Sequence, residues 1–134
     1  EIHYWRHIMS PIETINAFIQ AWDDYDLEKI YSFMADDIEW EDVPLSTVKG
    51  IEQVRAKMAN FPGVEACGFD THHIAANGNV VLTERTDWFE MKGRKRTIRV
   101  MGTFELNEDG KIAKWRDYFD IAEFQREFGD LAES

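Results

Sequence analysis

The first part of the chain carries hydrophobic residues at helical spacing. Ser10 and Glu13 form a capping box around Pro11, which suits the first position of a helix. Apolar residues then recur every three or four positions to about residue 23, as expected for one buried face of a helix. The predicted buried stripe comprises Ile12, Ile15, Phe18, Ile19 and Trp22.

Two further helices are predicted before residue 64. The first follows Asp26 and ends at the acids Asp36 and Asp37. Its apolar side comprises Leu27, Ile30, Phe33 and Met34. The second covers about residues 50–59 and stops at the Phe-Pro-Gly sequence of residues 61–63.

A short strand is predicted between these two helices, over residues 38–43. Its alternation places one set of side chains on a common face, namely Ile38, Trp40 and Asp42. The sequence Pro44-Leu45-Ser46 ends the strand.

From residue 64 onward the pattern alternates with a period of two. The predicted strands cover residues 64–75, 80–90, 97–106 and 115–120, and helical spacing resumes over 121–128. Asn77-Gly78 predicts the first hairpin turn, and the basic run 92–96 and the sequence 107–110 predict the other two. Helices followed by a meander of antiparallel strands predict one α+β domain, with the helices on one face of a curved sheet.

One face of the last strand is apolar except for Asp117, which lies between Trp115 and Phe119. The face of strand 80–90 that carries Val81, Thr83 and Phe89 also carries Arg85 and Asp87. Between these strands, strand 97–106 presents an uncharged face of Ile98, Val100, Gly102 and Phe104. We therefore expect Arg85, Asp87 and Asp117 to converge in a hydrophobic cavity, where Gly102 leaves room.

Two interpretations of this cluster remain open. Two close carboxylates cannot both ionise cheaply, and an arginine between them separates their pKa values, which suits one general acid and one general base. The alternative is a buried ion-pair network that only holds the sheet together.

Composition excludes several classes of partner. The chain has 134 residues and a formal net charge of −11, so phosphate-rich nucleic acids and anionic membranes would be repelled. Its one cysteine, Cys67, suits a reducing cytoplasm and excludes an intramolecular disulfide. The sequence has neither metal-ligand spacing nor an apolar run long enough to span a bilayer, so we expect no metal. We interpret residues 1–9 as an extension or a tag remnant, with Met9 a plausible native start.

Two polar clusters are interpreted as structural. His72 and His73 are adjacent on a strand, so they should face opposite ways and cannot share one metal. The cluster Arg94, Lys95 and Arg96 is interpreted as a solvated turn.

Glu84-Arg85-Thr86-Asp87, Gly110-Lys111-Ile112 and the segment Trp115–Asp120 together resemble the limonene epoxide hydrolase family, over about residues 10–128. The resemblance implies a cone-shaped α+β fold shared with nuclear transport factor two, ketosteroid isomerases and SnoaL-type cyclases. In that fold a curved mixed sheet of about five to six strands carries three to four helices on its concave face. The fold alone hosts many unrelated activities.

The resemblance also implies a reaction. It is a one-step hydration of a small apolar epoxide to a vicinal diol, without metal, cofactor or covalent intermediate. Asp117 would be the base that deprotonates water, Asp87 the acid that protonates the epoxide oxygen, and Arg85 the bridge between them. The expected pocket wall comprises Phe89, Ile98, Val100, Phe119 and Phe124. The resemblance, and the amphipathic outer face of the meander with Trp88 and Tyr118, also imply a homodimer.

Trp40 and Asp42 stand where the family has a tyrosine and an asparagine that help to hold the water. The resemblance makes them candidate water-positioning residues, although an indole N–H only donates and Trp40 is alternatively a core aromatic. Two other functions remain open for the same cavity. One is a SnoaL-like or ketosteroid-isomerase-like proton transfer on a carbon acid, and the other is non-catalytic binding of a small ligand.

Overall fold

The structure is a computed structural model that describes residues 8–61 and 63–133. Most of the predicted N-terminal extension, residues 1–7, lies outside the described residues. The helices are α1 (Pro11–Asp23), α2 (Leu27–Ser32), α3 (Ile51–Ala59), α4 (Ile121–Phe128) and the 3-10 helix η2 (Gly129–Glu133). The strands are β1 (Met34–Asp42), β2 (Ser46–Lys49), β3 (Val64–Asn77), β4 (Val80–Met91), β5 (Arg94–Leu106) and β6 (Ile112–Tyr118).

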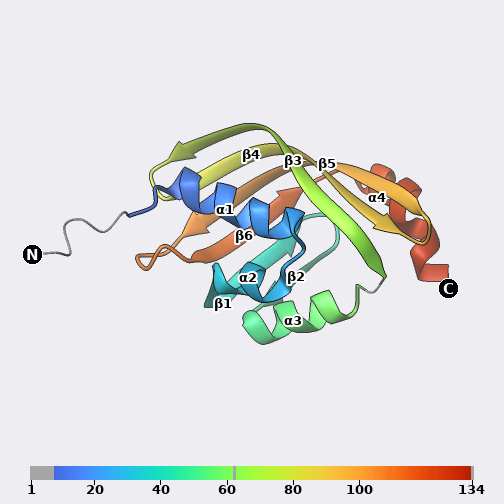
Figure 1. Cartoon of the computed structure of the whole chain (residues 1–134), viewed down its shortest axis with the longest axis horizontal. Helices are drawn as coiled ribbons and strands as arrows, with labels where there is room; N and C mark the ends of the chain where they lie inside the picture. The colour runs from blue at the N-terminus through green and yellow to red at the C-terminus, as the bar shows by residue number, and fades with distance from the viewer. Residues whose placement is uncertain (1–7, 62, 134) are drawn as a thin grey trace, which may run out of the picture.

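The six strands form one mixed sheet in the order β2-β1-β6-β5-β4-β3. Only β1 and β6 pair in parallel, and the other neighbours are antiparallel. The sheet curves over α1 without closing, while α3 lies against the β1–β2 end and α4 against β5 (Figure 1). This arrangement confirms the predicted α+β class, and its long strands place their inner faces around a common interior.

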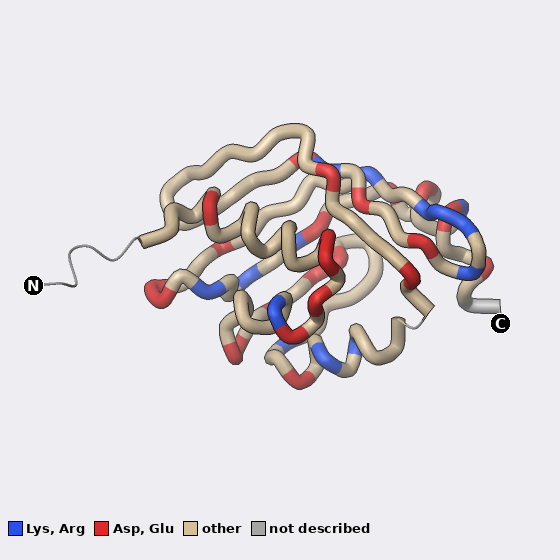
Figure 2. The backbone as a smooth tube through the Cα atoms, viewed as in Figure 1, with Lys and Arg blue, Asp and Glu red and all other residues tan. Residues whose placement is uncertain are grey.

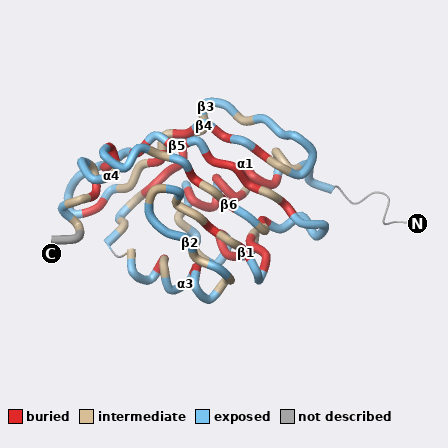
Figure 3. The backbone as a smooth tube through the Cα atoms, turned by 180° about the vertical axis from the view of Figure 1, so that it is seen from behind, coloured by how far each residue is buried: buried red, intermediate tan, exposed pale blue. Residues whose placement is uncertain are grey.

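The helix α1 supplies the central part of the core. Its capping box forms as predicted, because the Ser10 N–H donates to Glu13 Oε1 at 2.8 Å and the Glu13 N–H to Ser10 Oγ at 3.1 Å. The buried side of α1 packs against β3 and β4, and Figure 3 shows the buried positions gathered on the inner strands and this helix. Burial of these apolar side chains drives the helix onto the sheet.

The second helix is shorter than predicted, and β1 begins earlier. The helix α2 ends at Ser32, so Met34, Asp36 and Asp37 belong to β1. Met34 is the Cα partner of Ile112 in the parallel pair with β6, and this pairing between distant segments overrides the local helical spacing. The strand β2 was also missed: Pro44-Leu45 makes a turn, after which Ser46–Lys49 pairs back onto β1.

The prediction that Arg94, Lys95 and Arg96 form a solvated turn is wrong in placing them in a turn and in exposing Arg96, although Arg94 and Lys95 are exposed. The turn is only Lys92-Gly93, and β5 starts at Arg94. Arg96 is 1% exposed because its parity places it on the inner face, where its Nε donates to Met91 O at 3.1 Å. Its Nη1 and Nη2 bind Asp130, so this arginine joins the β4–β5 hairpin to the C-terminal helices. Figure 2 shows the run of basic residues at this hairpin beside the acidic residues of the C-terminal segment.

Candidate active site

The predicted charged cluster forms around the buried guanidinium of Arg85, which is 1% exposed. Arg85 donates from Nε to Asp87 Oδ1 at 2.9 Å and from Nη2 to Asp87 Oδ2 at 2.8 Å. The same Nη2 donates to Asp117 Oδ2 at 3.1 Å, and Nη1 donates to Thr83 Oγ1 at 3.0 Å. One arginine nitrogen therefore holds both carboxylates, in the charge-assisted geometry that fixes orientation most firmly.

The sheet register brings these residues together from three strands. Gly102 of β5 is the Cα partner of Asp117 on one side and of Thr83 on the other. A side chain at Gly102 would place its Cβ 2.6 Å from Asp117 Oδ1 and still closer to Arg85 Nη1. Glycine at this position is thus what allows Arg85 to cross β5 and reach Asp117.

The second oxygen of Asp117 is held by a residue that the sequence patterns did not single out. Trp115 donates from Nε1 to Asp117 Oδ1 at 2.8 Å. Its ring stacks on that of Trp40, with centroids 4.3 Å apart and planes 3° apart. The sequence pattern placed Trp115 on the same strand face as Asp117, two residues before it, but assigned it no role; that position was the usable signal.

Trp40 and Asp42 lie beside this group, on β1. Asp42 is the Cα partner of Asp117, and Lys57 Nζ of α3 donates to Asp42 Oδ2 at 2.6 Å. Lys57 also lies 4.2 Å from the centroid of the Trp40 ring, within the range of a cation–π contact. The indole N–H of Trp40 is buried and finds no hydrogen-bond partner among the described residues. Trp40 is therefore a core aromatic that also forms part of the cavity wall.

A cavity of about 440 Å³ opens onto the two carboxylates. Asp87 and Asp117 line it, as does Asp42, whereas Arg85 lies behind them. All the predicted wall residues line the cavity, namely Phe89, Ile98, Val100, Phe119 and Phe124. The sequence patterns missed the wall contributed by α1, by α3 and the two residues after it, and by β3, namely Trp22, Lys57, Met58, Asn60, Phe61 and Phe69. These residues meet the site only through tertiary packing, which no local spacing reveals.

Burial and neighbouring charges shift the pKa values of three members of the cluster, Asp87, Arg85 and Asp42. Burial raises the pKa of Asp87 to about 6, against the opposing influence of Arg85, and the nearby Asp117 and Asp42 raise it further. Burial alone would lower the pKa of Arg85, but Asp117 and Asp87 together raise it, so the guanidinium stays charged. Burial also raises the pKa of Asp42, while Lys57 lowers it. Asp87 is thus a carboxyl group that retains its proton at unusually high pH.

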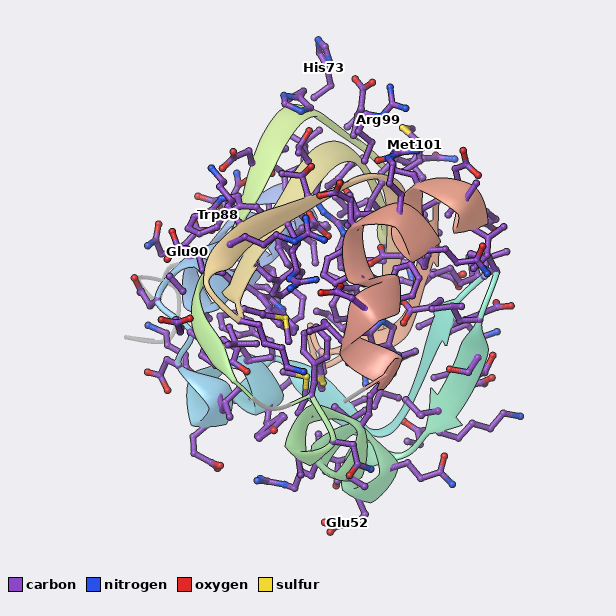
Figure 4. All side chains as sticks on the ribbon, turned by 90° about the vertical axis from the view of Figure 1, so that its right-hand side faces the viewer. Glu52, His73, Trp88, Glu90, Arg99 and Met101 are labelled. Carbon is purple, nitrogen blue, oxygen red and sulfur yellow. The ribbon has the colours of Figure 1, made fainter. Side chains whose placement is uncertain are left out.

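The described residues contain no group of three or more His, Cys, Asp or Glu side chains arranged to hold a metal ion. His72 and His73 both lie on the outer face of the sheet, because the register with β4 shifts between Thr71 and His73. His72 Nε2 pairs with Thr86 Oγ1 at 2.8 Å, and His73 Nδ1 with Glu84 Oε1 at 2.9 Å. Figure 4 shows His73 pointing away from the helices. The histidines therefore do not enter the cavity, although the expected opposite orientation is wrong. Within the described part of the chain, no helix is long and apolar enough to cross a membrane.

Comparison with known proteins shows to which family this chain belongs. The model of the limonene-1,2-epoxide hydrolase catalytic domain matches residues 9–128. The chain belongs to this family. One family relative, the epoxide hydrolase EphG of Mycobacterium tuberculosis, is 33% identical over 107 residues, which cover 80% of this chain and 71% of that protein.

Solved structures give the same family and a wider fold group. An epoxide hydrolase of M. tuberculosis described as similar to limonene epoxide hydrolase has a TM-score of 0.76 at 29% identity, and the match covers 91% of this chain and 94% of that one. A SnoaL-like polyketide cyclase from Shewanella putrefaciens has a TM-score of 0.79 at 13% identity, covering 92% and 99% of the two chains. The second likeness shows the fold alone.

Proposed function

We propose that this protein hydrates a small, mostly apolar epoxide to a vicinal diol by general acid and base catalysis. The observation that carries the proposal is the position of Arg85 Nη2, 2.8 Å from Asp87 and 3.1 Å from Asp117, with both carboxylates facing a largely apolar cavity. Membership of the limonene-1,2-epoxide hydrolase family supports the same reaction. A structural ion-pair network would not need to expose its acids to a cavity.

In the proposed step, Asp117 accepts a proton from a water molecule while the water oxygen attacks one epoxide carbon. The bond between that carbon and the epoxide oxygen breaks, and Asp87 gives its proton to the departing oxygen. The diol gains one hydroxyl from water and one from the opened ring, so the step needs neither an oxidant nor a covalent intermediate. Proton return from Asp117 to Asp87 then restores the starting state.

Arg85 acts as a positioning residue in this mechanism. It does not line the cavity, so substrate does not reach it. Its bidentate bond to Asp87 and single bond to Asp117 keep both acids oriented as the proton moves from one side to the other. The permanent charge of the guanidinium offsets whichever carboxylate is ionised.

The substrate class follows from the walls of the cavity. They are dominated by aromatic and aliphatic side chains, and a dry pocket limits attack by stray water. A volume of about 440 Å³ suits a small cyclic or terpene-like epoxide.

A panel of terpene and cycloalkene oxides, assayed for diol, tests the proposal. The wild-type protein should hydrate at least one of them, and Asp117→Asn and Asp87→Asn should each lower kcat by about a hundredfold or more. Asp109→Asn, an exposed position in the β5–β6 turn, is the matched control and should retain activity. A folded Asp117→Asn variant with undiminished turnover would end the proposal.

A second candidate is proton transfer on a carbon acid, as in SnoaL-like cyclases. It is favoured by one observation: Asp42 adds a third carboxylate next to Asp117, which suits proton abstraction as well as water activation. Exchange of deuterium into a ketone substrate, with no diol from any epoxide, would support it over epoxide hydration.

We also propose a homodimer that forms through the outer face of the sheet. Three large apolar side chains lie exposed on that face: Leu82 is 47% exposed, Met101 53% and Tyr118 48%. Met101 and Tyr118 are direct neighbours on β5 and β6. Figure 4 shows Met101 at the outside of the molecule, where it is open to a partner.

A further inference from the structure

Lys57 is the cation of the cavity wall. Among the described residues that line the cavity, it is the only lysine or arginine, and it faces a wall that carries three aspartates. It lies on α3, so its approach to the site depends on the packing of that helix against β1 and β2. Its side chain is only 24% exposed, and that of its partner Asp42 is 18% exposed.

Asp42 depends on Lys57 for its counter-ion. The guanidinium of Arg85 donates its hydrogen bonds to Thr83, Asp87 and Asp117 and, among the described residues, none to Asp42. Lys57 Nζ donates to Asp42 Oδ2 at 2.6 Å. Without this lysine, the cavity would hold three carboxyl groups against a single guanidinium, which would force a further proton onto them.

The hydrogen bond from Lys57 to Asp42 Oδ2 also fixes the orientation of the second carboxylate oxygen, Oδ1. Among the described residues, the side-chain hydrogen bond of Asp42 goes to Oδ2 and none goes to Oδ1. Asp42 lines the cavity next to Asp117. Asp42 Oδ2 is held by Lys57, and Lys57 is itself held over the ring of Trp40 at 4.2 Å. The position of the free oxygen is therefore fixed by its neighbours on α3 and β1.

We propose that Lys57 is a positioning residue that keeps Asp42 anionic and aims its free oxygen at the water that Asp117 activates. The inference rests on the proposed epoxide hydration. One proton of the water is then accepted by Asp117 and the other is held by Asp42, which leaves a lone pair of the oxygen directed into the cavity. An anionic acceptor strengthens this hold relative to a neutral one.

The charges around Asp42 give the direction of the pH effect. Asp42 faces Lys57 from α3, Asp117 from β6 and Arg85 and Asp87 from β4. Burial raises the pKa of Asp42, Lys57 lowers it, Asp117 raises it and Arg85 lowers it. Removal of Lys57 therefore raises this pKa further, and Asp42 would stay protonated to a higher pH.

The test compares Lys57→Met with Lys57→Arg and with the double variant Asp42→Asn/Lys57→Met. Lys57→Met should lower kcat roughly tenfold or more at neutral pH, since a charge-assisted hydrogen bond is lost. It should also move the acid limb of the kcat/KM profile to higher pH. Lys57→Arg should keep kcat and the pH profile close to those of the wild type, because a guanidinium keeps Asp42 ionised. The double variant should recover most of the activity, because the amide oxygen that replaces the carboxylate still accepts a hydrogen bond from the water and needs no counter-ion.

Arg55→Met is the matched control. Arg55 lies on the same helix, pairs with Glu28 at 3.0 Å and lies 4.4 Å from the Tyr31 ring centroid, but it does not line the cavity. This variant removes an equivalent cation and should leave both kcat and the pH profile unchanged. An equal loss in Arg55→Met would mean that only helix stability was measured, and it would overturn the proposal.

A second readout needs no substrate. Titration of the aspartate carboxyl carbons by NMR should show Asp42 taking up its proton at higher pH in Lys57→Met than in the wild type. If Asp42 titrates alike in both, and Lys57→Met matches the wild type in kcat and pH profile, the role of Lys57 is wrong while epoxide hydration stands. If the wild type makes no diol, epoxide hydration itself is wrong, and the catalytic role of Lys57 falls with it.

Discussion

Gly102 sets how closely Arg85 can approach Asp117. Any larger residue brings a Cβ to 2.6 Å from Asp117 Oδ1, and the atoms on the other side belong to Arg85 and Thr83. All of these groups are buried, so they have little room to move.

Gly102→Ala should therefore displace the guanidinium, lower kcat by more than about tenfold and cost roughly 1–3 kcal/mol of unfolding free energy. Denaturant unfolding and diol assays measure the two effects. Gly129→Ala is the control, because a Cβ at Gly129 meets nothing within 4 Å. Wild-type activity in Gly102→Ala would show that the bond between Arg85 and Asp117 is not needed.

The protonation of Asp87 predicts the alkaline side of the pH profile. Burial raises the pKa of Asp87 to about 6, and the proposed acid must carry its proton to open the epoxide. The protonated fraction declines as pH rises through that value, so kcat/KM should fall above pH of about 6. Initial rates across a buffer series measure this limb. A profile that stays flat from acidic to alkaline pH would exclude Asp87 as the acid.

Strand alternation was sufficient to predict that Arg85, Asp87 and Asp117 meet. Arg85, Asp87 and Asp117 each lie on an otherwise apolar strand face, and such a pattern has few alternative placements in a meander. Lys57 gave no such signal, because a lysine on an exposed-looking helix is the commonest of all patterns. The hydrogen bond from Trp115 to Asp117 was missed for a related reason: a large aromatic on a strand is explained by the core alone.

At the scale of elements, α4 combines two kinds of contact. Its aromatic residues Phe124 and Phe128 line the cavity. Its acidic residue Glu123 binds β5, accepting from Arg99 Nη2 at 2.8 Å and from the Arg99 N–H at 2.7 Å. Glu127 adds a bond from the Thr97 N–H at 3.1 Å. Charged contacts to β5 thus hold the helix that forms this part of the cavity wall.

Glu123→Gln should loosen α4. Arg99 holds the pKa of Glu123 below its usual range. The wild-type contact should therefore persist as pH falls through the ordinary carboxyl range and weaken only below it. At neutral pH, the variant should show several-fold faster amide hydrogen exchange over residues 121–128 and a raised KM. Glu108→Gln, in an exposed turn, is the control. Unchanged exchange in Glu123→Gln would contradict this account of α4.

The elements with strong local signals were predicted well. The capping box of α1 and the hairpin after β3 are formed by neighbouring residues, so the sequence reveals them directly. The start of β1 and the whole of β2 depend on pairing with strands elsewhere in the chain. Likewise Arg96 is buried only because the C-terminal helices pack on the β4–β5 hairpin and supply its acceptors.

At the scale of the whole molecule, the exposed apolar side chains on the outer face of the sheet lead us to predict a dimer. Met101→Lys would place a charge in the centre of the proposed interface, next to Tyr118. Sedimentation should give twice the chain mass for the wild type and one chain mass for this variant. Ile8→Lys is the control, since Ile8 is 86% exposed and precedes α1, which packs on the inner face of the sheet. A wild-type protein that sediments as a single chain would exclude the dimer.

The fold does not by itself select the reaction. A SnoaL-like cyclase at 13% identity matches this chain with a TM-score of 0.79, and an epoxide hydrolase at 29% identity matches with 0.76. What supports epoxide hydration for this chain is membership of the family, together with the buried arginine and the two carboxylates that it joins.

The most direct test of this assignment follows the oxygen atom of the attacking water. A single turnover is run in ¹⁸O-labelled water with the protein in excess over an epoxide that it hydrates. Direct attack by a water that Asp117 activates predicts one ¹⁸O atom in the diol formed in this first turnover, and unlabelled protein. A diol without label, with ¹⁸O appearing in an aspartate carboxyl group, would mean that the carboxylate attacks the epoxide and would contradict the account.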